Sequence, residues 1–293
     1  MHISVIIPNL NSTMIDQTLD ALRQQRFDLS QTEVLVVGLD QPGLIVEDAL
    51  VRFISTGKPA SPARARNMGL AAAQGQLLCF TDADCLPTPD WLAQLADACT
   101  QPGVAIVGGG VIFTANNYWS QCDNVSWFHE YTTEAGAGER PLLPSLNLCI
   151  KRSVYEQVGG FDERYPRPAG EDAEWTTRIR QAGYTLHFHP EIIVHHKPSR
   201  SSFESFIRHS YTYGLYSIKV TPAYADFLQT PFVLRRWWTL LMAMPLLALA
   251  ITAKIYQQNR WVRQNYPHCA WGIYLSKIVW CLGAARSLYK EGE

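Results

Sequence analysis

Residues 77–84 read LLCFTDAD, a short apolar run that ends in two aspartates, Asp82 and Asp84. Four apolar residues in a row, bounded by polar ones, are typical of a strand buried on both faces. Two aspartates directly after such a strand can face one hard cation, because carboxylate oxygens select Mg²⁺ or Mn²⁺ and leave room for a diphosphate. An acidic turn that only closes the strand is the alternative that this stretch by itself leaves open.

Strands and helices alternate on both sides of this stretch. The patterns of apolar residues predict strands at 3–7, 33–37, 77–80, 104–107, 111–113, 184–188 and 192–195, and helices at 14–25, 61–74, 90–99, 152–158 and 171–182. This alternation predicts a sheet built from βαβ units. Ligands bind such sheets at the carboxyl ends of the strands, so the functional site is expected there. Glycines 108–110 permit a close approach to a neighbouring strand. Residues 115–145 are aromatic and irregular and are expected to face the substrate as a mobile stretch.

The composition indicates a globular protein. The chain has 293 residues, enough for one large domain with an appendage, and its 47% hydrophobic and 17% charged residues give no sign of disorder. A net charge of −1 speaks against a nucleic-acid binder, whose binding face would be basic. The N-terminal run lacks a charged leader and a cleavage site, and the seven cysteines form no C-x-x-C pair. The catalytic body is therefore expected to stay in the cytoplasm with reduced thiols.

The C-terminal segment differs from the rest of the chain in charge and hydropathy. From Arg235 onward there are eight basic and two acidic residues, which leaves +6 in this segment and −7 in residues 1–234. Residues 237–253 contain no charge, and seventeen residues are at the short limit of a membrane-spanning helix. An apolar, basic segment on an acidic body predicts that 235–290 associate with an anionic membrane surface.

Three arrangements of this segment stay open. A single crossing at 237–253 would leave basic residues on both sides of the membrane, against the positive-inside tendency. A break at Pro245 would give a re-entrant or interface-lying hairpin with all basic residues on the cytoplasmic face, and this is the arrangement we favour. A buried helix pair that closes a soluble domain is the third.

Five short motifs follow one another along the chain: VIIP at 5–8, ARNMG at 65–69, FTDAD at 80–84, VGGFDE at 158–163 and GED at 170–172. In this order they resemble the family of inverting, nucleotide-sugar-dependent glycosyltransferases with the GT-A fold, the glycosyltransferase family 2 type, over roughly residues 2–215. The resemblance implies an α/β fold, a Rossmann-like mixed sheet flanked by helices, to which the C-terminal segment adds apolar, membrane-associated helices. The expected domains are a catalytic domain at 1–225, with a nucleotide-sugar-binding half at 1–114 and an acceptor half at 115–225, and a membrane-associated region at 226–293.

The resemblance assigns the donor nucleotide to two stretches. Pro8, Asn9 and Asn11, in the turn after the first strand, would line the nucleoside pocket. Arg66 and Asn67 would approach the base and phosphate from their helix. Arginine on a helix is otherwise often only a solvated side chain.

The same resemblance implies the metal site. Asp82 would face the ribose or the metal, and Asp84 would bind the metal that bridges the diphosphate. Of the pair His195 and His196, the register favours His196 as a further metal or diphosphate contact, although a lone histidine is often purely structural. One departure concerns the second strand, where relatives often carry an acidic residue directly after the strand to hold the base. Here Asp40 comes two residues later and is the candidate for that role.

Three residues are placed on the catalytic and acceptor sides. Asp172, with Glu171 beside it, matches the catalytic base, and Asn147 falls where the acceptor side is built. The implied enzyme is a metal-dependent inverting transferase that uses Mn²⁺ or Mg²⁺ and a nucleoside-diphosphate sugar, most simply a UDP-sugar. Its acceptor would be a saccharide or a lipid-linked molecule in envelope polysaccharide or glycolipid biosynthesis, at the cytoplasmic face of the inner membrane.

Two other functions are weighed against this one. A sugar nucleotidyltransferase also joins such a sheet to metal-binding aspartates, but it usually holds a triphosphate in a glycine-rich, basic loop after the first strand. The turn at 8–12 has neither glycine nor Lys or Arg. A catalytically inactive, membrane-bound relative is the other alternative, and the intact Asp82, Asp84 and Asp172 speak against it.

Overall fold

The computed structural model describes residues 2–114, 117–197 and 201–291 and divides the chain into two compact units. The sheet unit comprises Met1–Ile112 and Gly136–Lys197, and the helical unit comprises Phe113–Ala135 and Pro198–Glu293. The predicted boundary after residue 225 is not where this division falls. Helices α4 (Tyr118–Phe128) and α7 (Phe203–Ser217) pack against α11 (Ala270–Glu291), so their apolar side chains belong to the helical core.

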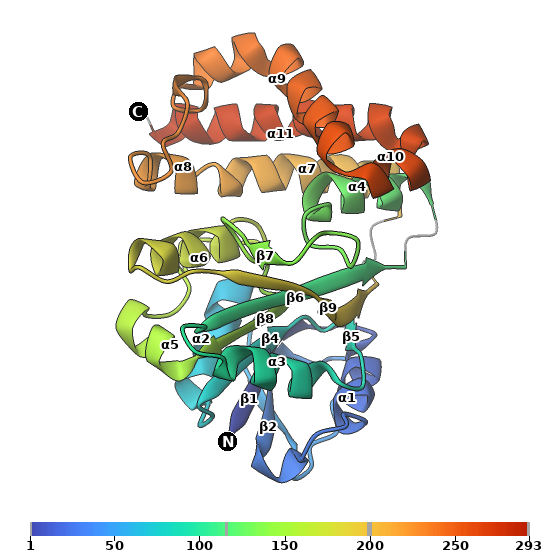
Figure 1. Cartoon of the computed structure of the whole chain (residues 1–293), viewed down its shortest axis with the longest axis vertical. Coiled ribbons are helices and arrows are strands. Elements are labelled where there is room, and N and C mark those ends of the chain that lie inside the picture. The colour runs from blue at the N-terminus through green and yellow to red at the C-terminus, as the bar shows by residue number, and fades with distance from the viewer. Residues whose placement is uncertain (1, 115–116, 198–200, 292–293) are drawn as a thin grey trace. The chain divides into compact units, whose positions relative to one another are not determined.

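One mixed sheet forms the centre of the sheet unit, as predicted (Figure 1). Within the described residues its strands are β1 (Ile3–Leu10), β2 (Thr32–Leu39), β3 (Val51–Ser55), β4 (Leu77–Thr81), β5 (Cys85–Pro87), β6 (Ile106–Phe113), β7 (Gly138–Glu139), β8 (Asn147–Lys151) and β9 (His187–His196). Their order is β3-β2-β1-β4-β8-β6-β9-β5, with β7 beside β9. The pairs β3–β2, β2–β1 and β1–β4 are parallel, whereas β8 pairs antiparallel with β4 and β6. The carboxyl ends of β1, β2 and β4 therefore share one edge of the sheet.

Helices flank this sheet close to where the sequence predicts them. They are α1 (Ile15–Arg23), α2 (Pro62–Ala72), α3 (Trp91–Thr100), α5 (Arg152–Val158) and α6 (Glu171–Gln181), with a short 3₁₀ turn at Leu29–Gln31. Helix α2 begins at a strong N-cap, because the Ser61 hydroxyl accepts from the Arg64 amide and Pro62 occupies the first turn. It packs on β1 and β2, while α3 packs on β8 and β9.

The predicted close approach at the glycines of β6 is confirmed. A Cβ added at Gly109 would lie 2.2 Å from the carbonyl oxygen of Ile192, and one at Gly110 would lie 2.3 Å from that of Pro190. Both carbonyls belong to β9, so the two strands can pair only where β6 carries no side chain. The paired runs predicted as separate strands on each side of these glycines, and on each side of Pro190, merge into the continuous strands β6 and β9.

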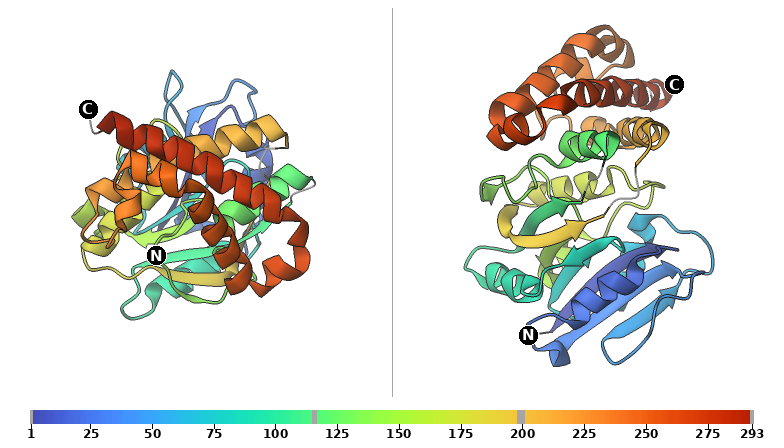
Figure 2. Two further views of the ribbon diagram at one scale, coloured as in Figure 1. Left: turned by 90° about the horizontal axis from the view of Figure 1, so that it is seen from above. Right: turned by 90° about the vertical axis from the view of Figure 1, so that its right-hand side faces the viewer.

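The helical unit is a bundle centred on α11. Its other helices are α4, α7, α8 (Val220–Ala223), α9 (Trp237–Gln258) and α10 (Arg260–Asn265), with 3₁₀ turns at Phe232–Leu234 and Pro267–Cys269. Helices α7 and α11 pack against each other and lie one above the other in Figure 1 and in the right-hand view of Figure 2. Their contact depends on two glycines, since a Cβ on Gly214 would lie 2.1 Å from the Trp280 carbonyl oxygen and one on Gly283 would lie 2.2 Å from that of Tyr211.

Two expectations about this part of the chain are corrected. The stretch 115–145 is not irregular throughout, because α4 occupies Tyr118–Phe128, with Asn117 as its N-cap and Cys122 in the helical core; positions 115–116 lie outside the described residues. Pro245 does not split the apolar run into two legs, since α9 continues through it as one helix. A proline removes only one backbone donor, and neighbouring packing can retain the helix around it.

Candidate active site

The Asp-x-Asp turn after β4 is held against the turn that follows β1. The Ser12 hydroxyl donates to the carbonyl oxygen of Ala83, between the two aspartates, at 2.9 Å. The side chains of Asp82 and Asp84 are 29% and 37% exposed, so both carboxylates reach solvent. The acidic pair therefore lies at the sheet edge where the sequence predicts the site.

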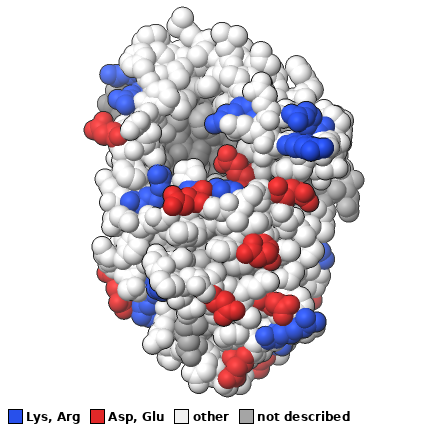
Figure 3. Space-filling view, in the orientation of Figure 1, with Lys and Arg blue, Asp and Glu red and all other residues white. Residues whose placement is uncertain are grey.

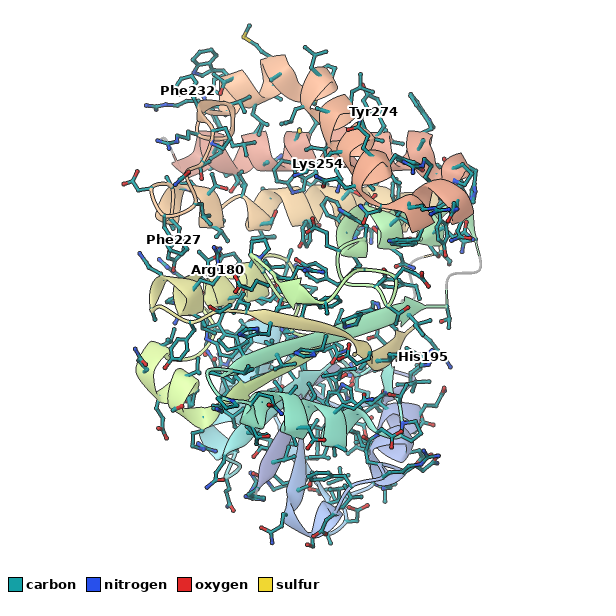
Figure 4. The ribbon with its side chains drawn as sticks, viewed as in Figure 1. Arg180, His195, Phe227, Phe232, Lys254 and Tyr274 are labelled. Atoms are coloured by element: carbon teal, nitrogen blue, oxygen red, sulfur yellow. The ribbon has the colours of Figure 1, made fainter. Side chains whose placement is uncertain are left out.

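Asp84, Cys85 and His196 offer ligand atoms within 4.8 Å of one another. Strands β5 and β9 pair with Cys85 opposite His196, and His196 Nε2 lies 3.6 Å from Asp84 Oδ1. Burial, reinforced by the nearby aspartates, raises the pKa of the Cys85 thiol well above its usual range. The oxygen and nitrogen donors of Asp84 and His196 fit Mn²⁺ or a similar divalent ion. His195, labelled in Figure 4, is the neighbour on β9 and is less buried than His196.

Arg66 of α2 is almost completely buried and joins two carboxylates. Its Nη2 donates to Asp82 Oδ1 at 2.8 Å, and its Nη1 donates to Glu171 Oε1 at 3.1 Å. The guanidinium also lies over the Phe161 ring, 5.4 Å from the centroid. Only 3% of the Arg66 side chain is exposed. Arg66 thus forms an ion-pair bridge inside the protein, and its contact with the nucleotide stays a prediction.

Asn67 makes its contacts with the loop that follows α5. Its Nδ2 donates to the Phe161 carbonyl at 2.9 Å and to Glu163 Oε1 at 3.0 Å, while its Oδ1 accepts from the Phe161 amide at 2.8 Å. Gly160 makes room for this side chain, because a Cβ there would lie 2.3 Å from Asn67 Oδ1. The ARNMG and VGGFDE motifs thus meet through one amide side chain.

The GED motif forms the start of α6. Gly170 adopts the left-handed region (φ 91°) as the N-cap, and Glu171 and Asp172 occupy the first turn. Asp172 Oδ1 accepts from the Ala173 amide at 2.8 Å, and Oδ2 accepts from the Ser145 amide at 3.4 Å. An anion at this position is favoured by the helix dipole. The Asp172 side chain is half-buried, whereas Glu171 is 4% exposed.

The environment of these two carboxyl groups raises both pKa values. Burial and the neighbouring Asp172 carboxylate raise the pKa of Glu171 to about 7, although Arg66 opposes the shift. Burial likewise raises the pKa of Asp172, against the opposing charge of Arg66. Asp172 is thus the more accessible member of the pair, and Glu171 is the buried member that contacts Arg66.

The turn after β1 is built from its own polar side chains. Asn9 is buried, and its Nδ2 donates to the Leu39 carbonyl at 2.8 Å. Asn11 adopts a left-handed backbone (φ 57°), and its Oδ1 accepts from the Gln41 amide at 2.8 Å. Pro8 and Asn11 are half-buried. These contacts fix the shape of the turn, and of the three predicted residues Pro8 and Asn11 keep surface for a ligand, whereas Asn9 does not.

Asp40 is engaged with the loop that follows it. Its Oδ1 accepts from the Leu44 amide at 3.2 Å, and its Oδ2 accepts from the Ile45 amide at 2.8 Å. Both carboxylate oxygens therefore stabilise the turn after β2. Asp40 is predicted to hold the nucleobase, and it would have to do so with a carboxylate that already accepts these two hydrogen bonds.

Asn147 lies inside the sheet. It is fully buried; its Nδ2 donates to the carbonyls of Gly110 and Ile192 at 3.0 and 2.8 Å, and its Oδ1 accepts from Trp91 Nε1 at 2.8 Å. An acceptor cannot contact a side chain that has no exposed surface. The prediction of Asn147 on the acceptor side is wrong in this structure, and the residue instead fastens β8 to β6, β9 and α3.

Comparison with known proteins identifies the chain. Residues 4–159 match the family model described as Glycosyl transferase family 2. The chain belongs to glycosyltransferase family 2. It is 31% identical over 245 residues to glycosyltransferase AglE of Haloferax volcanii, an alignment that covers 80% of this chain and 79% of AglE. The family 2 membership confirms the resemblance and removes the nucleotidyltransferase alternative.

Solved structures show that this family 2 member has the GT-A fold. The mannosyltransferase PcManGT of Pyrobaculum calidifontis, solved with GDP-Man and Mn²⁺, superposes with a TM-score of 0.66 at 19% identity, covering 100% of this chain and 88% of that one. GalNAc-T7, solved with UDP, GalNAc and Mn²⁺, superposes with a TM-score of 0.56 at 16% identity, covering 80% of this chain and 52% of that one.

Three residues of the family 2 site were not singled out from the sequence. Ser12 follows the VIIP motif, and Glu163 is the last residue of the VGGFDE motif. Their positions in turns next to motif residues are the signal by which the sequence could have identified them. Ser145 lies in the stretch predicted to be irregular and acts through its backbone amide, for which the sequence holds no signal. Arg66 connects Asp82 with Glu171. The candidate site therefore contains both the solvent-accessible Asp-x-Asp turn and the carboxyl groups at the start of α6.

Proposed function

We propose that this family 2 glycosyltransferase moves a sugar from a nucleoside-diphosphate sugar, most simply a UDP-sugar, to an acceptor hydroxyl with inversion at the anomeric carbon. The observation that carries the proposal is the Arg66 bridge. Its two bonds, 2.8 Å to Asp82 and 3.1 Å to Glu171, join the Asp-x-Asp turn to the start of α6, which supports assigning Asp172 to the same site. A metal-assisted single displacement uses carboxylates that hold the ion, here in the Asp-x-Asp turn, and a carboxylate that accepts the proton of the acceptor, here Asp172.

Asp84 and His196 are the residues that would hold a divalent ion, Mn²⁺ or Mg²⁺, together with the donor diphosphate. Such an ion, when bound, neutralises charge that develops on the departing diphosphate. Asp82 is held by Arg66 through one oxygen, which leaves the other for the ribose or the ion. The turn at Pro8 and Asn11 would form part of the nucleoside pocket.

Asp172 would act as the general base. The acceptor hydroxyl transfers its proton to the Asp172 carboxylate as its oxygen forms the bond to the anomeric carbon, and the bond from that carbon to the diphosphate breaks. The attack comes from the face opposite the leaving group, so one displacement inverts the centre. Glu171 is unsuited to this role, since it is buried and its Oε1 accepts from Arg66.

Thermal unfolding with a panel of nucleotide sugars, each with and without Mn²⁺, tests the donor. A true donor stabilises the folded protein by mass action, about 2.7 kcal/mol at a hundredfold excess over Kd. We expect a Mn²⁺-dependent shift for a UDP-sugar and release of UDP in the presence of an acceptor. Stabilisation without any release of nucleotide by transfer or hydrolysis would instead indicate the inactive relative.

We also propose that the helical unit attaches the enzyme to the cytoplasmic face of the membrane, where a lipid-linked or envelope saccharide would serve as acceptor. Helix α9 is long and apolar enough to cross a membrane by length and composition. Its inner face carries Leu240 and Ala248, which are buried in the bundle. Its outer face exposes apolar side chains, and the surface over α9 in Figure 3 is uncharged. These exposed residues are Trp238 (47%), Leu241 (36%), Met242 (77%), Leu246 (73%) and Leu249 (58%).

The shape of the bundle favours α9 lying in the membrane surface over α9 crossing it. A crossing helix would take its partner α11 into the lipid as well, and α11 carries Lys277, Arg286 and Lys290. An in-plane helix buries only its outer face and leaves flanking cations such as Lys254 at the headgroups. Phe232, 63% exposed, and Lys254 are both labelled on the helical unit in Figure 4.

Sedimentation with anionic vesicles tests the attachment. Leu246→Glu should weaken binding by about tenfold or more, because it places a charge in the middle of the apolar face. Val46→Glu is the matched control, since Val46 is a comparably exposed apolar residue (64%) of the sheet unit. Equal binding of both variants would refute the α9 face. In cells, a single cysteine at Gln257, in a background without native cysteines, should resist labelling from outside; labelling there would refute the in-plane arrangement.

A further inference from the structure

The two adjacent polar residues Arg66 and Asn67 of α2 make their hydrogen bonds with other parts of the sheet unit. Arg66 is 3% exposed and both of its terminal nitrogens donate to carboxylates of other elements. Asn67 uses both atoms of its amide on the loop after α5. These bonds connect α2 to Asp82, to the start of α6 and to the loop after α5.

The loop between α5 and α6 is fastened on its other side to α6. Trp175 Nε1 donates to the Gly159 carbonyl at 2.8 Å, and Arg178 donates to the carbonyls of Val158 and Gly160, both at 2.7 Å. The Phe161 ring packs on Trp175 with centroids 4.1 Å apart. Asn67 therefore holds a loop that is also bonded to α6.

Arg66 acts on the same helix at its first residue. Because Glu171 opens α6 and is followed directly by Asp172, any shift of the Arg66–Glu171 pair shifts the base. The guanidinium is a planar fork, so it fixes the direction as well as the distance of both carboxylates it contacts. Its second contact is Asp82, which belongs to the Asp-x-Asp turn.

We propose that Arg66 and Asn67 are positioning residues, which set the place of the base Asp172 relative to the Asp-x-Asp turn. This inference rests on the proposed function of Asp172. Arg66 acts through Glu171, and Asn67 acts through the loop at 159–163. A base displaced by about 1 Å can lose on the order of 10²-fold in rate, so positioning residues affect turnover much more than they affect donor binding.

The main test is a double-mutant cycle on Arg66→Lys and Glu171→Gln. Lysine keeps the charge but cannot hold two carboxylates in a fixed geometry, and glutamine keeps an oxygen that can accept from Arg66. We expect kcat to fall about 10²-fold in Arg66→Lys and about tenfold in Glu171→Gln, with the Kd of UDP and Mn²⁺ within about threefold of the wild type. Because the two residues act through one contact, the double variant should lose about 10²-fold rather than the 10³-fold of independent effects.

Arg64→Ala is the matched control, since Arg64 lies on the same helix two residues earlier and is exposed. Its kcat and Kd should equal those of the wild type. Asn67→Ala is the second variant and should lower kcat with donor Kd unchanged, which keeps the test decisive if Arg66→Lys unfolds in a thermal scan. A rise in the Kd of UDP with kcat retained, or independent effects in the cycle, would overturn the positioning role. Failure of the proposed function would be visible beforehand, as a wild-type protein that binds donors without turnover.

Discussion

Replacement of Asp172 by asparagine tests the catalytic assignment most directly. Asparagine is nearly isosteric, and its Oδ1 can still accept from the Ala173 amide, which lies 2.8 Å from Asp172 Oδ1. The contact with the Ser145 amide is long, 3.4 Å, so its loss should change the stability of the fold by less than about 1 kcal/mol. The variant should fold and bind the donor as the wild type does. What it loses is the ability to accept a proton.

The expected loss in kcat is a factor on the order of 10² to 10⁴, the contribution of a positioned general base. This corresponds to about 3–5 kcal/mol of transition-state stabilisation at 1.36 kcal/mol per factor of ten. The assay measures release of nucleoside diphosphate at saturating donor and acceptor, and calorimetry measures donor affinity separately. Turnover within threefold of the wild type would refute the assignment, as would a loss of donor affinity with turnover of the bound donor unchanged.

The pH dependence of turnover gives a second reading of the same variant. A base works only when it is deprotonated, and burial raises the pKa of Asp172. The adjacent Glu171 carboxyl, with a pKa of about 7, titrates together with it. Turnover of the wild type should therefore rise with pH, and this rise should occur at a higher pH than for an ordinary aspartate. In Asp172→Asn this acidic limb should disappear, because the residual rate no longer depends on deprotonation of residue 172.

Three further outcomes are expected. Asp84→Ala should abolish the Mn²⁺-dependent part of donor binding, and an unchanged affinity in calorimetry would remove this residue from the metal site. Asn147→Ala should lower the free energy of unfolding by roughly 2–5 kcal/mol, since it leaves Trp91 Nε1 and two carbonyls without their partner; chemical denaturation measures this, and a stable variant with a raised acceptor KM would restore the acceptor role. Gly283→Ala should lower the melting temperature, because its Cβ would lie 2.2 Å from the Tyr211 carbonyl oxygen.

The parallel half of the sheet can be predicted because its signals are local. The apolar runs of β1, β2 and β4 are each long enough to identify a buried strand, and their order fixes the edge where ligands bind. The antiparallel half lacks such signals. Strand β8 has five residues and enters between β4 and β6, a pairing that depends on contacts far apart in the sequence. The sequence suggests a functional role for its first residue, Asn147, because it does not reveal whether an asparagine side chain is buried or exposed.

The partners within the site could not be predicted for a similar reason. The order of the five motifs indicates that they meet, but Arg66 and Glu171 are 105 residues apart, and the sequence does not say which side chains pair. Helix α4 shows the same limit, because its aromatic residues do not reveal that it packs against α11. Pattern and motif therefore predict positions along the chain, whereas pairing follows from packing.

Two adjacent carboxyl groups receive different tasks from their surroundings. Glu171 is turned inward, is buried, and contacts Arg66, so it stabilises the start of α6. Asp172 is half-buried, accepts one short bond from the backbone, and keeps lone pairs for an acceptor hydroxyl. Arg66 balances charge that would otherwise raise the cost of burying both. Environment and not residue type decides which of two carboxylates can act as a base, so the arginine that holds Glu171 leaves Asp172 as the proposed base.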